Sequence, residues 1–515
     1  MSDAITLHSI CHPGRPIPHK DSHEGSPGLF AFHKAKSFGP YIPCNGDQLS
    51  WLIGMNEMTR TFGLELLEII LSTYPAVFFS HPEFVFLLKE RVCALVIKLF
   101  PPKVKHQSRS SPAQQAASQD KPYYPVSLLL LRLVTVLVQK YYTILEYPFS
   151  ISLTALYSAI QDIDFIVWTG DLPPNDVWET DGTENVHIIQ EMTDLLVEFS
   201  PNIPVYGAIG NHESHPLNAY PIPEIEGENS VTWLYNAIAD AWSVWLPEEA
   251  LTTLRYGGYN SALVRDGLWI ISDDFNYCYT SNWWLIHESR DPAHGLQFIQ
   301  SELEKAEAAN EKVYIISHIV PGNGDCWQIY TRELSKVVNR FEATLAGQFY
   351  GHTHKDEFKI FYDSEDSSRA INVAWIGSSL STYGDVNPGY KVYILDGERE
   401  GSTFGMLDHE AWTMNLTEAN IGPSEPHWFK LYDGRETFGL NSLSAQDMAD
   451  LVHRFIVDDE LFQVYYRNYM RQADPAILEG CGEGCKKSKL CAMVTTDFGD
   501  KTKCNEISRK MDLHD

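Results

Sequence analysis

The sequence predicts a layered α/β fold, and two kinds of pattern along the 515 residues lead to that prediction. After residue 150, short apolar runs end abruptly in polar or glycine-containing loops, which is typical of strands covered on both faces. The runs are Phe165–Trp168, Val205–Ile209, Leu268–Ile271 and Val313–Ile316. Residues 295–310 have the spacing of an amphipathic helix that leads into the last run. In such folds, ligand sites collect at the strand ends.

The first 120 residues are expected to form an irregular N-terminal region. Residues 1–50 are rich in His, Pro, Gly and Ser and predict loops, whereas residues 51–100 predict short helices and residues 103–121 a polar linker. Residues 1–10 have neither a basic start nor a long apolar run, so they do not match a secretory signal.

A longer apolar stretch, Val126–Val138, follows the linker and is interrupted by Arg132. A membrane span needs about 20 apolar residues, so this stretch is too short and too interrupted to predict one. A buried strand or core helix is the favoured interpretation. The region 121–400 that begins here contains the alternating apolar runs and is predicted to be the main α/β domain.

The region 401–515 is predicted to be helical and to end in a stapled tail. Residues 443–472 carry apolar side chains at helical spacing, which predicts amphipathic helices packed on the main domain. Four cysteines crowd the polar tail, namely Cys481, Cys485, Cys491 and Cys504. A zinc knuckle is one interpretation, and a pair of disulfides, which would require an oxidising compartment, is the other.

The charge of the chain excludes one class of partner. The formal net charge is -29 and the sequence pI is about 5.0. A nucleic-acid-binding protein needs a basic surface that displaces the counterions of the polyanion. Nucleic acid is therefore not an expected partner.

Four polar loops at the ends of strand-like runs carry residues that bind metals. They are Thr169-Gly-Asp171, Gly210-Asn-His-Glu213, Ser317-His-Ile-Val-Pro-Gly322 and Gly351-His-Thr-His354. A carboxylate, an amide oxygen and several imidazoles together satisfy a divalent metal such as zinc. Glycine beside these residues lets the backbone approach a crowded centre. One such string is a weak signal, but four in this order predict a metal site.

The order of these motifs resembles the calcineurin-like metallophosphoesterases, and further strings resemble their acid sphingomyelinase branch. Those strings are Trp168-Thr-Gly-Asp-Leu-Pro173, Gly210-Asn-His-Glu-Ser214, Gln348-Phe-Tyr-Gly-His-Thr-His354, Asn387-Pro-Gly-Tyr390 and Leu416-Thr-Glu-Ala-Asn-Ile421. The similarity runs from about Tyr147 to Asp500. It implies a metallophosphoesterase β-sandwich flanked by helices in residues 121–400, followed by the helical C-terminal region.

The resemblance also implies roles for particular residues. Asp171 resembles the carboxylate that bridges two Zn²⁺ ions, and His354 resembles a ligand of one of them. Asn211, His318 and His352 resemble the remaining ligands of the other ion. His212 resembles the general acid that protonates the departing alkoxide. The reaction implied is hydrolysis of sphingomyelin, at a membrane surface, to ceramide and phosphocholine.

Further implications concern covalent features and location. Cys278 with Cys326, Cys481 with Cys485, and Cys491 with Cys504 are placed like the family's disulfides. The sequon Asn415-Leu-Thr417 falls where the family carries a glycan, although such triplets also arise by chance. By resemblance, the protein is expected to be secreted or lysosomal.

The sequence departs from the family pattern near its start. The pattern begins with a strand that ends in Asp-x-His and supplies two ligands to the first zinc, and the corresponding stretch, Pro125–Gln139, contains neither Asp nor His. Asp21-Ser-His23 has the right letters but no strand before it. Without replacements, that ion keeps only Asp171 and His354, too few for a firm zinc site.

Two smaller departures concern the substrate. Asn175 stands where close relatives have a histidine near the substrate phosphate, so that His212 would act alone as proton donor. The family's saposin-like N-terminal domain uses six cysteines, whereas this chain has only Cys11, Cys44 and Cys93 before residue 150. A lipid-presenting domain is therefore not predicted.

Three hypotheses follow from the sequence. The first is a sphingomyelin phosphodiesterase whose N-terminal region is shortened or misjoined. The second is a pseudoenzyme that keeps the fold and one metal and only binds a phosphorylated ligand. The third is a sphingomyelinase-like phosphodiesterase that acts on nucleotides.

Overall fold

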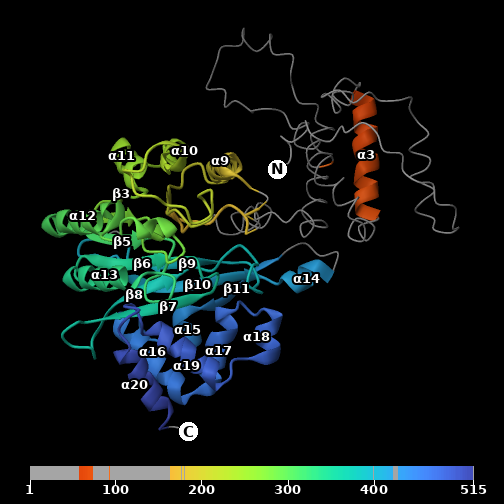
Figure 1. The fold of residues 1–515 in the computed structure, drawn as a ribbon. Helices are drawn as coiled ribbons and strands as arrows, with labels where there is room; N and C mark the ends of the chain where they lie inside the picture. The colour runs from red at the N-terminus through yellow and green to blue at the C-terminus, as the bar shows by residue number, and fades with distance from the viewer. Residues whose placement is uncertain are drawn as a thin grey trace. The chain divides into compact units, whose positions relative to one another are not determined.

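The computed structural model describes residues 57–73, 92, 163–175, 177–178, 180–397, 399–421 and 427–513. The chain divides into two compact units, Met1–Glu146 and Tyr147–Asp515. In the first unit the structure describes α3 (Glu57–Thr73), within the stretch predicted to be helical. The stretches Asp21–His23 and Val126–Val138 lie outside the described residues. Every strand of the described chain belongs to the second unit (Figure 1).

A six-stranded mixed sheet forms the centre of the second unit, with the strand order β3-β4-β5-β6-β8-β7. The strands are β3 (Asn260–Arg265), β4 (Leu268–Ser272), β5 (Lys312–Ile316), β6 (Leu345–Tyr350), β7 (Glu357–Tyr362) and β8 (Ala370–Ile376). The four inner strands are parallel, and β3 and β7 pair antiparallel at the two edges. The carboxyl ends of the parallel strands therefore meet at one edge, where the polar loops begin.

Both faces of this sheet are buried, as the continuous apolar runs predict. In β5, Val313 and Ile315 contact the core that includes α12 (Gly295–Ala309) and α13 (Gln328–Arg340), whereas Tyr314 and Ile316 contact the core on the opposite face. The alternation follows from the two-residue period of a strand. An amphipathic α12 covers one face, and this confirms the helix predicted from residues 295–310.

A second sheet of three strands packs on the first. It contains β9 (Gly389–Leu395), β10 (Met406–Met414) and β11 (Trp428–Asp433) in the order β11-β10-β9. Aromatic side chains join the two sheets, and the ring centroid of Tyr393 lies 5.0 Å from that of Phe349 and 6.4 Å from that of Trp375. This arrangement is the expected sandwich. The boundary predicted at residue 400 falls between two strands that pair with each other, β9 and β10.

A short parallel pair completes the strands that lead to the polar loops. β1 (Ile166–Trp168) pairs with β2 (Val205–Gly207), and Ser272 Oγ of β4 donates a hydrogen bond of 2.7 Å to the Gly207 carbonyl. Asp181 begins the following helix, α9 (Gly182–Phe199), because its Oδ1 accepts hydrogen bonds from the backbone N–H groups of Thr183 and Glu184. Helices α10 (Thr232–Trp242) and α11 (Glu248–Gly257) follow β2.

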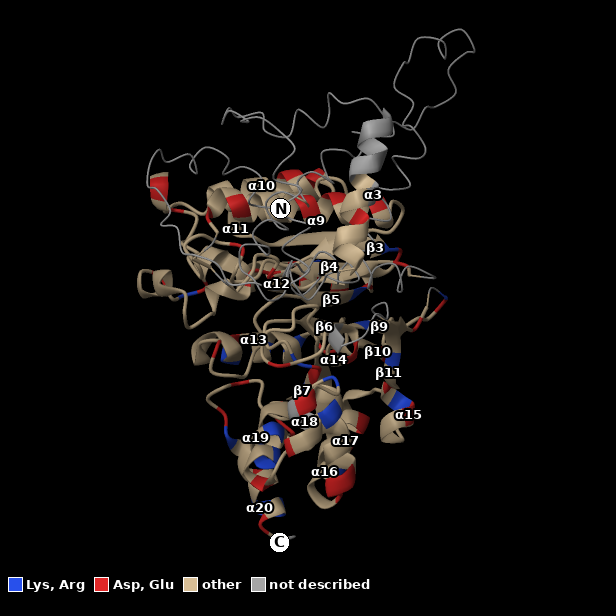
Figure 2. Ribbon diagram, turned by 90° about the vertical axis from the view of Figure 1, so that its right-hand side faces the viewer, with Lys and Arg blue, Asp and Glu red and all other residues tan. Residues whose placement is uncertain are grey.

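Short 3₁₀ helices connect several of these elements. They are η4 (Gly227–Asn229), η5 (Phe275–Tyr277), η6 (Trp283–Ile286) and η7 (Pro292–His294). Figure 2 colours acidic residues red on the ribbon, and several of them lie in α9, opposite in sign to the residues that a polyanion-binding surface requires.

The C-terminal region is helical, as predicted. Its helices are α14 (Leu416–Ile421), α15 (Gly434–Phe438), α16 (Ala445–Val457), α17 (Asp459–Tyr469), α18 (Asp474–Glu479), α19 (Glu483–Met493) and α20 (Thr502–Met511). Buried side chains from α16 and α17, such as Phe455 and Phe462, join the core that also contains Trp375 of β8. Within the described part of the chain, no helix is long and apolar enough to cross a membrane.

Candidate metal centre

Asp171 stands in the loop after β1, and its backbone conformation is unusual. Its φ is 62°, in the left-handed region, and it follows Gly170 with a φ of 89°. The loops after β1 and β2 are in direct contact, because a Cβ on Gly170 would lie 2.4 Å from the Gly210 nitrogen and a Cβ on Gly210 would lie 2.2 Å from Asp171 Oδ1. Glycine is therefore required where these two loops meet.

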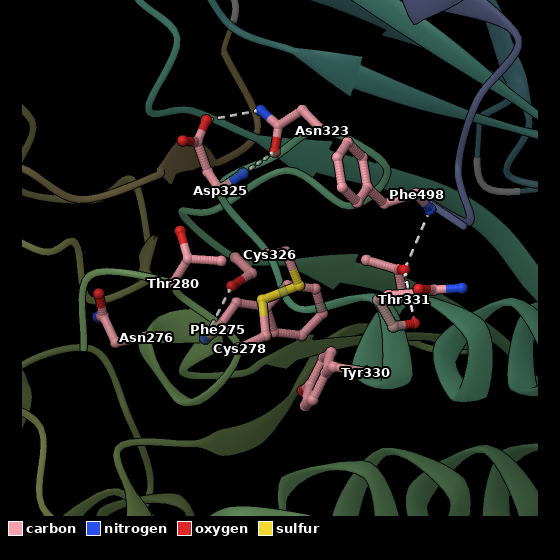
Figure 3. Close-up of a disulfide and its surroundings, with 12 residues drawn as sticks. Phe275, Asn276, Cys278, Thr280, Asn323, Asp325, Cys326, Tyr330, Thr331 and Phe498 are labelled. Carbon is pink, nitrogen blue, oxygen red and sulfur yellow. Dashed lines mark hydrogen bonds between the residues drawn. A yellow bond between two sulfur atoms is a disulfide. The ribbon is translucent and has the colours of Figure 1, made fainter. Parts of the chain in front are cut away.

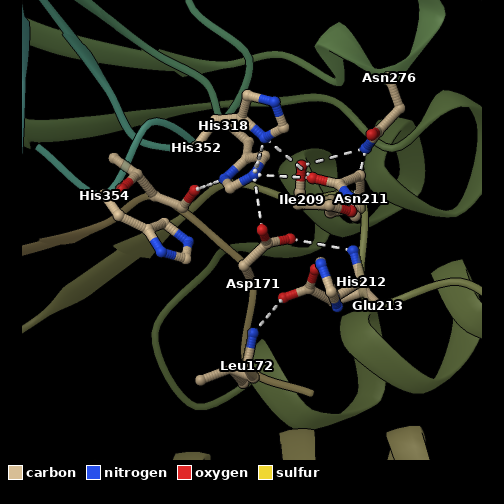
Figure 4. A network of polar contacts seen from close by, with 12 residues as sticks. Asp171, Leu172, Ile209, Asn211, His212, Glu213, Asn276, His318, His352 and His354 are labelled. Carbon is tan, nitrogen blue, oxygen red and sulfur yellow. Dashed lines mark hydrogen bonds and ion pairs between the residues drawn. The ribbon is translucent and has the colours of Figure 1, made fainter. Parts of the chain in front are cut away.

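Three further predicted ligands converge beside Asp171 (Figure 4). His318 Nε2 lies 2.9 Å from Asp171 Oδ2 and 3.1 Å from Asn211 Oδ1. His352 Nδ1 lies 3.0 Å from Asn211 Oδ1 and 3.2 Å from His318 Nε2. Their loops follow β2 of the two-stranded sheet and the neighbouring strands β5 and β6 of the six-stranded sheet, so three strand ends position them. Asn211 and His318 are almost fully buried, at 4% and 1% exposure.

The chemistry and spacing of these four atoms fit a divalent cation. Zinc bonds to oxygen and nitrogen of about 2.1 Å place the ligands of a tetrahedral site roughly 3.4 Å apart, close to the separations found between these atoms. His318 Nδ1 lies 2.6 Å from the Thr169 carbonyl, which favours a proton on Nδ1 and leaves Nε2 to face the cluster. The four donors include one carboxylate, one amide oxygen and two imidazoles, a set that suits zinc.

The electrostatics of the cluster favour a positive charge within it. Burial raises the pKa of the Asp171 carboxyl, but the neighbouring His318 more than offsets this and holds that pKa well below its ordinary value. Burial lowers the pKa of His318, but Asp171 more than offsets this and the net shift is upward. Burial, with His318 beside it, lowers the pKa of His352 to about 3, so this imidazole stays neutral as a metal ligand must.

His354 lies apart from the other predicted ligands, and Figure 4 draws it on the opposite side of Asp171 from Asn211. Its Nδ1 lies 3.0 Å from the Tyr383 carbonyl oxygen, and its Nε2 takes no part in that contact. The half-buried side chain has a pKa lowered by burial. His352 and His354 both have left-handed backbones, with φ values of 69° and 61°. Such strain persists where the surrounding structure fixes a functional conformation.

His212 follows Asn211 and contacts Asp171 through its backbone. The His212 N–H donates a 2.9 Å hydrogen bond to Asp171 Oδ1, and His212 Nδ1 lies 3.2 Å from the Pro174 carbonyl. A proton on Nδ1 that is directed at Pro174 leaves Nε2 as the atom able to exchange a proton with a substrate. Asn175, next to Pro174, is half-buried in the same loop.

Several residues support the cluster that the sequence did not single out for a role. Glu213 is 3% exposed, and its Oε1 accepts a 3.0 Å hydrogen bond from the Leu172 N–H. Asn276 Nδ2 donates to the carbonyls of Ile209 and Gly210, at 3.2 and 3.1 Å, and so holds the strand end that carries Asn211. One feature of the sequence could have indicated this network. Asp273 and Asp274 are two consecutive carboxylates that directly follow the apolar strand β4.

Buried hydroxyl groups complete this support. Asp274 Oδ1 accepts a 2.7 Å hydrogen bond from Asn276 Nδ2, and Asp274 Oδ2 accepts one of 2.7 Å from Tyr235 Oη. Tyr220 Oη donates to the Gly210 carbonyl at 2.5 Å. Burial raises the pKa of Asp274 to about 7 and that of the adjacent Asp273 to about 8. The Asn211 loop thus rests on a buried polar network.

A disulfide borders the centre (Figure 3). Cys278 and Cys326 are bonded, and Tyr279, the residue after Cys278, has its ring centroid 5.2 Å from that of His352. The structure also pairs Cys481 with Cys485 and Cys491 with Cys504. These are the pairings that the resemblance implied. Because the four tail cysteines are joined to one another, they do not form a zinc knuckle.

Asn415 stands immediately before α14, and its Oδ1 accepts a 3.0 Å hydrogen bond from the Glu418 N–H. It is half-buried. The sequon therefore lies at a helix start in the C-terminal region, and glycosylation there stays a prediction.

Comparison with known proteins agrees with the fold. The family model of the calcineurin-like phosphoesterases matches residues 150–356, and that of the acid sphingomyelin phosphodiesterase C-terminal region matches residues 372–511. A third model, the Mon2/Sec7/BIG1-like HUS domain, matches residues 44–169. This last match covers the stretch in which the Asp-x-His motif was sought.

Curated relatives share much of the sequence. Sphingomyelin phosphodiesterase of Bos taurus is 43% identical over 352 residues, which are 68% of this chain and 56% of that protein. The Homo sapiens protein of the same name is 43% identical over 67% of this chain and 54% of its own length. Human cyclic GMP-AMP phosphodiesterase SMPDL3A is 30% identical over 68% of this chain and 78% of its own length. Against the sphingomyelin phosphodiesterases, the chain spans about half their length.

A dimetal phosphatase from Danio rerio covers 55% of this chain and 89% of its own, with a TM-score of 0.33 and 11% identity. The two family models and the curated relatives establish the class, a calcineurin-like metallophosphoesterase. Within that class, the chain belongs to the acid sphingomyelinase-type family.

Proposed function

We propose that the chain hydrolyses the phosphodiester of sphingomyelin, or of a closely related lipid, to ceramide and phosphocholine at a membrane surface. The observation that carries the proposal is the convergence of Asp171, Asn211, His318 and His352 at separations of about 3 Å. The name of the two relatives at 43% identity supports the substrate class. Zinc is the metal that this donor set fits best.

The proposed site has two sides that share one carboxylate. Asp171 would bridge two ions, with Asn211, His318 and His352 on one side and His354 on the other. Bound divalent ions supply Lewis acidity toward the phosphoryl oxygen and lower the pKa of water to about 7. The residues of the chain hold the donors in place, and burial lowers the pKa of His352 and of His354, which favours the neutral imidazole that a metal ligand needs.

His212 is the proposed general acid. Hydrolysis adds water across the bond between phosphorus and the lipid oxygen, so that the alkoxide leaves with the electron pair of that bond and needs a proton. His212 Nε2 would donate this proton while Nδ1 remains on the Pro174 carbonyl. Asn175 in the same loop has no titratable proton, which leaves His212 as the proposed donor.

Zinc content and turnover together test the proposal. Full-length chain equilibrated with zinc is expected to bind two equivalents and to release phosphocholine from sphingomyelin in detergent micelles. One equivalent of zinc or less with no turnover, or no clustering of the five predicted ligands around zinc in a crystal structure, would overturn it. A chimera whose residues before Tyr147 come from the bovine relative tests whether an upstream strand with Asp-x-His raises zinc content and turnover.

One observation favours the pseudoenzyme instead. Of the predicted ligands within the described residues, the second ion has only Asp171 and His354. A chain that binds one equivalent of zinc, binds phosphocholine and shows no turnover would support this function. Turnover of sphingomyelin by the chain itself would reject it.

The relative named a cyclic GMP-AMP phosphodiesterase favours a nucleotide substrate. A panel that compares sphingomyelin with cyclic GMP-AMP at equal zinc loading separates the two. The proposed lipid activity requires kcat/KM for sphingomyelin to be the higher by at least about ten-fold, a difference of about 1.4 kcal/mol in transition-state stabilisation.

We also propose a secreted or lysosomal location. Three disulfides support it, because such bonds persist in oxidising compartments. Mass spectrometry of the secreted protein would reveal the disulfides and any glycan on Asn415. Free thiols at all six of these cysteines in freshly isolated protein would contradict this location.

A further inference from the structure

Arg471 is a buried cation far along the sequence from the metal-binding motifs. It follows α17 directly and is 1% exposed. Removing a guanidinium from water costs free energy unless its donors find good acceptors. Burial lowers the pKa of Arg471 to about 10, an effect that the nearby Asp356 partly opposes. A charge kept in such a place requires an explanation.

The donors of Arg471 point to backbone and hydroxyl oxygens. Nη1 donates a 2.7 Å hydrogen bond to the His354 carbonyl, Nη2 donates one of 3.2 Å to Ser379 Oγ, and Nε donates to the Asn387 carbonyl. Asp356 does not serve as an acceptor in these contacts; its Oδ1 lies 2.5 Å from Lys391 Nζ. The guanidinium therefore contacts two loops, the one between β6 and β7 and the one between β8 and β9, and is not one half of an ion pair.

The surroundings are shaped for this side chain. A Cβ on Gly389 would lie 2.4 Å from Arg471 Cδ and 3.0 Å from its Nε, so only glycine leaves room there. Asn387 Nδ2 donates a 3.0 Å hydrogen bond back to the Arg471 carbonyl. Arg471 itself has a φ of 52°, in the left-handed region. Strain and complementary space at the same residue indicate a selected position.

The segment that Arg471 contacts is also strained. His354 has a φ of 61°, its carbonyl accepts from Arg471, and its imidazole contacts the Tyr383 carbonyl. The C-terminal region makes a second hydrogen bond to this segment two residues after His354. There the Asp356 N–H donates to the Tyr469 carbonyl at 3.2 Å. Without these contacts, the left-handed conformation of His354 would lose its main external support.

We propose that Arg471 is a positioning residue: the C-terminal region supplies it to fix the backbone of His354 and so orient that imidazole beside Asp171. The ligand role of His354 rests on the proposed function, whereas the fixing of its backbone does not. The inference gives the C-terminal region a part in the metal centre, although that region contributes none of the predicted ligands.

Hydrogen exchange of the full chain tests this inference. In Arg471→Met, amide exchange in residues 351–356 is expected to rise by about ten-fold or more, while exchange in β4 and β5 stays as in the wild type. Arg471→Lys keeps the charge but cannot reach all three acceptors, and a smaller rise of about three-fold is expected. Arg454→Met is the matched control, because Arg454 also donates to a backbone carbonyl, that of Phe438, at 2.7 Å.

The outcomes separate the inference from the proposed function. Local loosening of residues 351–356 in the Arg471 variants, with none in Arg454→Met, supports positioning even if the chain binds no zinc. Unchanged exchange in Arg471→Lys and Arg471→Met overturns it, and so does a rise spread evenly over the whole chain, which marks a merely structural role. If Arg471→Met does not fold, Arg471→Lys decides. Zinc affinity, measured by chelator competition in the same samples, reports on the proposed function separately.

Discussion

The two sides of Asp171 are built in different ways. On one side, Asn211, His318 and His352 come from loops after β2, β5 and β6, and all belong to one compact unit. On the other side lies His354, and the family pattern adds an Asp-x-His there, whereas the corresponding stretch of this chain, Pro125–Gln139, contains neither Asp nor His. The ends of β2 and of the paired strands β5 and β6 bring these ligands together, whereas a ligand pair on a further strand depends on that strand being present.

The largest expected effect comes from the residue that the two sides share. Asp171→Asn removes the bridging charge, and we expect zinc binding to weaken on both sides and turnover to fall by about 10³-fold or more. Chelator competition and phosphocholine release measure the two effects. Asp363→Asn, at a partly buried carboxylate that pairs with Arg369 outside the metal centre, is the control and should behave as the wild type in both assays. Undiminished zinc binding in Asp171→Asn would contradict the prediction that the two sides of the site share the Asp171 carboxylate.

Substitution on each side separately sharpens the comparison. His352→Ala removes a donor from the side with four converging atoms, and its tightest zinc affinity is expected to fall by about 100-fold or more. His354→Ala is expected to leave that affinity within about three-fold, because His354 lies outside the cluster. Isothermal titration with zinc measures both. Equal losses in the two variants would show that the sides do not act separately.

His212 separates chemistry from metal binding. In His212→Gln the backbone N–H that contacts Asp171 remains, so zinc affinity should not change. Turnover is expected to fall by about 10²- to 10⁴-fold, the usual contribution of a general acid. The loss should appear in kcat, since proton donation stabilises the transition state. Weakened zinc binding in this variant would assign His212 to the metal site instead.

The buried carboxyl groups of Asp273 and Asp274 belong to the network that supports the Asn211 loop, and they predict that the stability of the fold depends on pH. Burial raises the pKa of Asp273 to about 8 and of Asp274 to about 7, from 3.8 for an ordinary carboxyl. Between pH 4 and pH 8 the folded state therefore binds more protons than the unfolded state, and the free energy of unfolding decreases as the pH rises. The effect should suit an acidic compartment.

Urea denaturation at pH 5 and pH 8 measures this dependence. Asp273→Asn is expected to flatten it and to exceed the wild type at pH 8 by on the order of 1–3 kcal/mol. Asp363→Asn is again the control. Backbone hydrogen bonds and Arg369 lower the pKa of Asp363 to about 2, so the stability contributed by that carboxylate is present at both pH values. Equal stability of the wild type at pH 5 and pH 8 would contradict the prediction.

The sequence by itself determined the parallel strands β1, β2, β4 and β5, the helix before β5 and the order of the metal-binding loops. Each of these is encoded locally, because continuous apolar runs and glycine beside Asp171 or His352 reflect burial and close approach at that point in the chain. The helical spacing of residues 443–472 also predicted the helical C-terminal region, and the family resemblance added the cysteine pairs. The antiparallel strands β9 to β11 were not located in advance, since their alternating side chains face another sheet.

Only the tertiary structure decided which side chains share a neighbourhood. It gathered Asp171, Asn211, His318 and His352, left His354 on the other side of Asp171, and placed Asn276 and Arg471 against the strand ends and loops of the centre. These contacts join residues that are separated by many positions in the chain. The physical reason is that a buried amide or guanidinium takes its role from the carbonyls it reaches, and no local pattern of sequence specifies that distant partner.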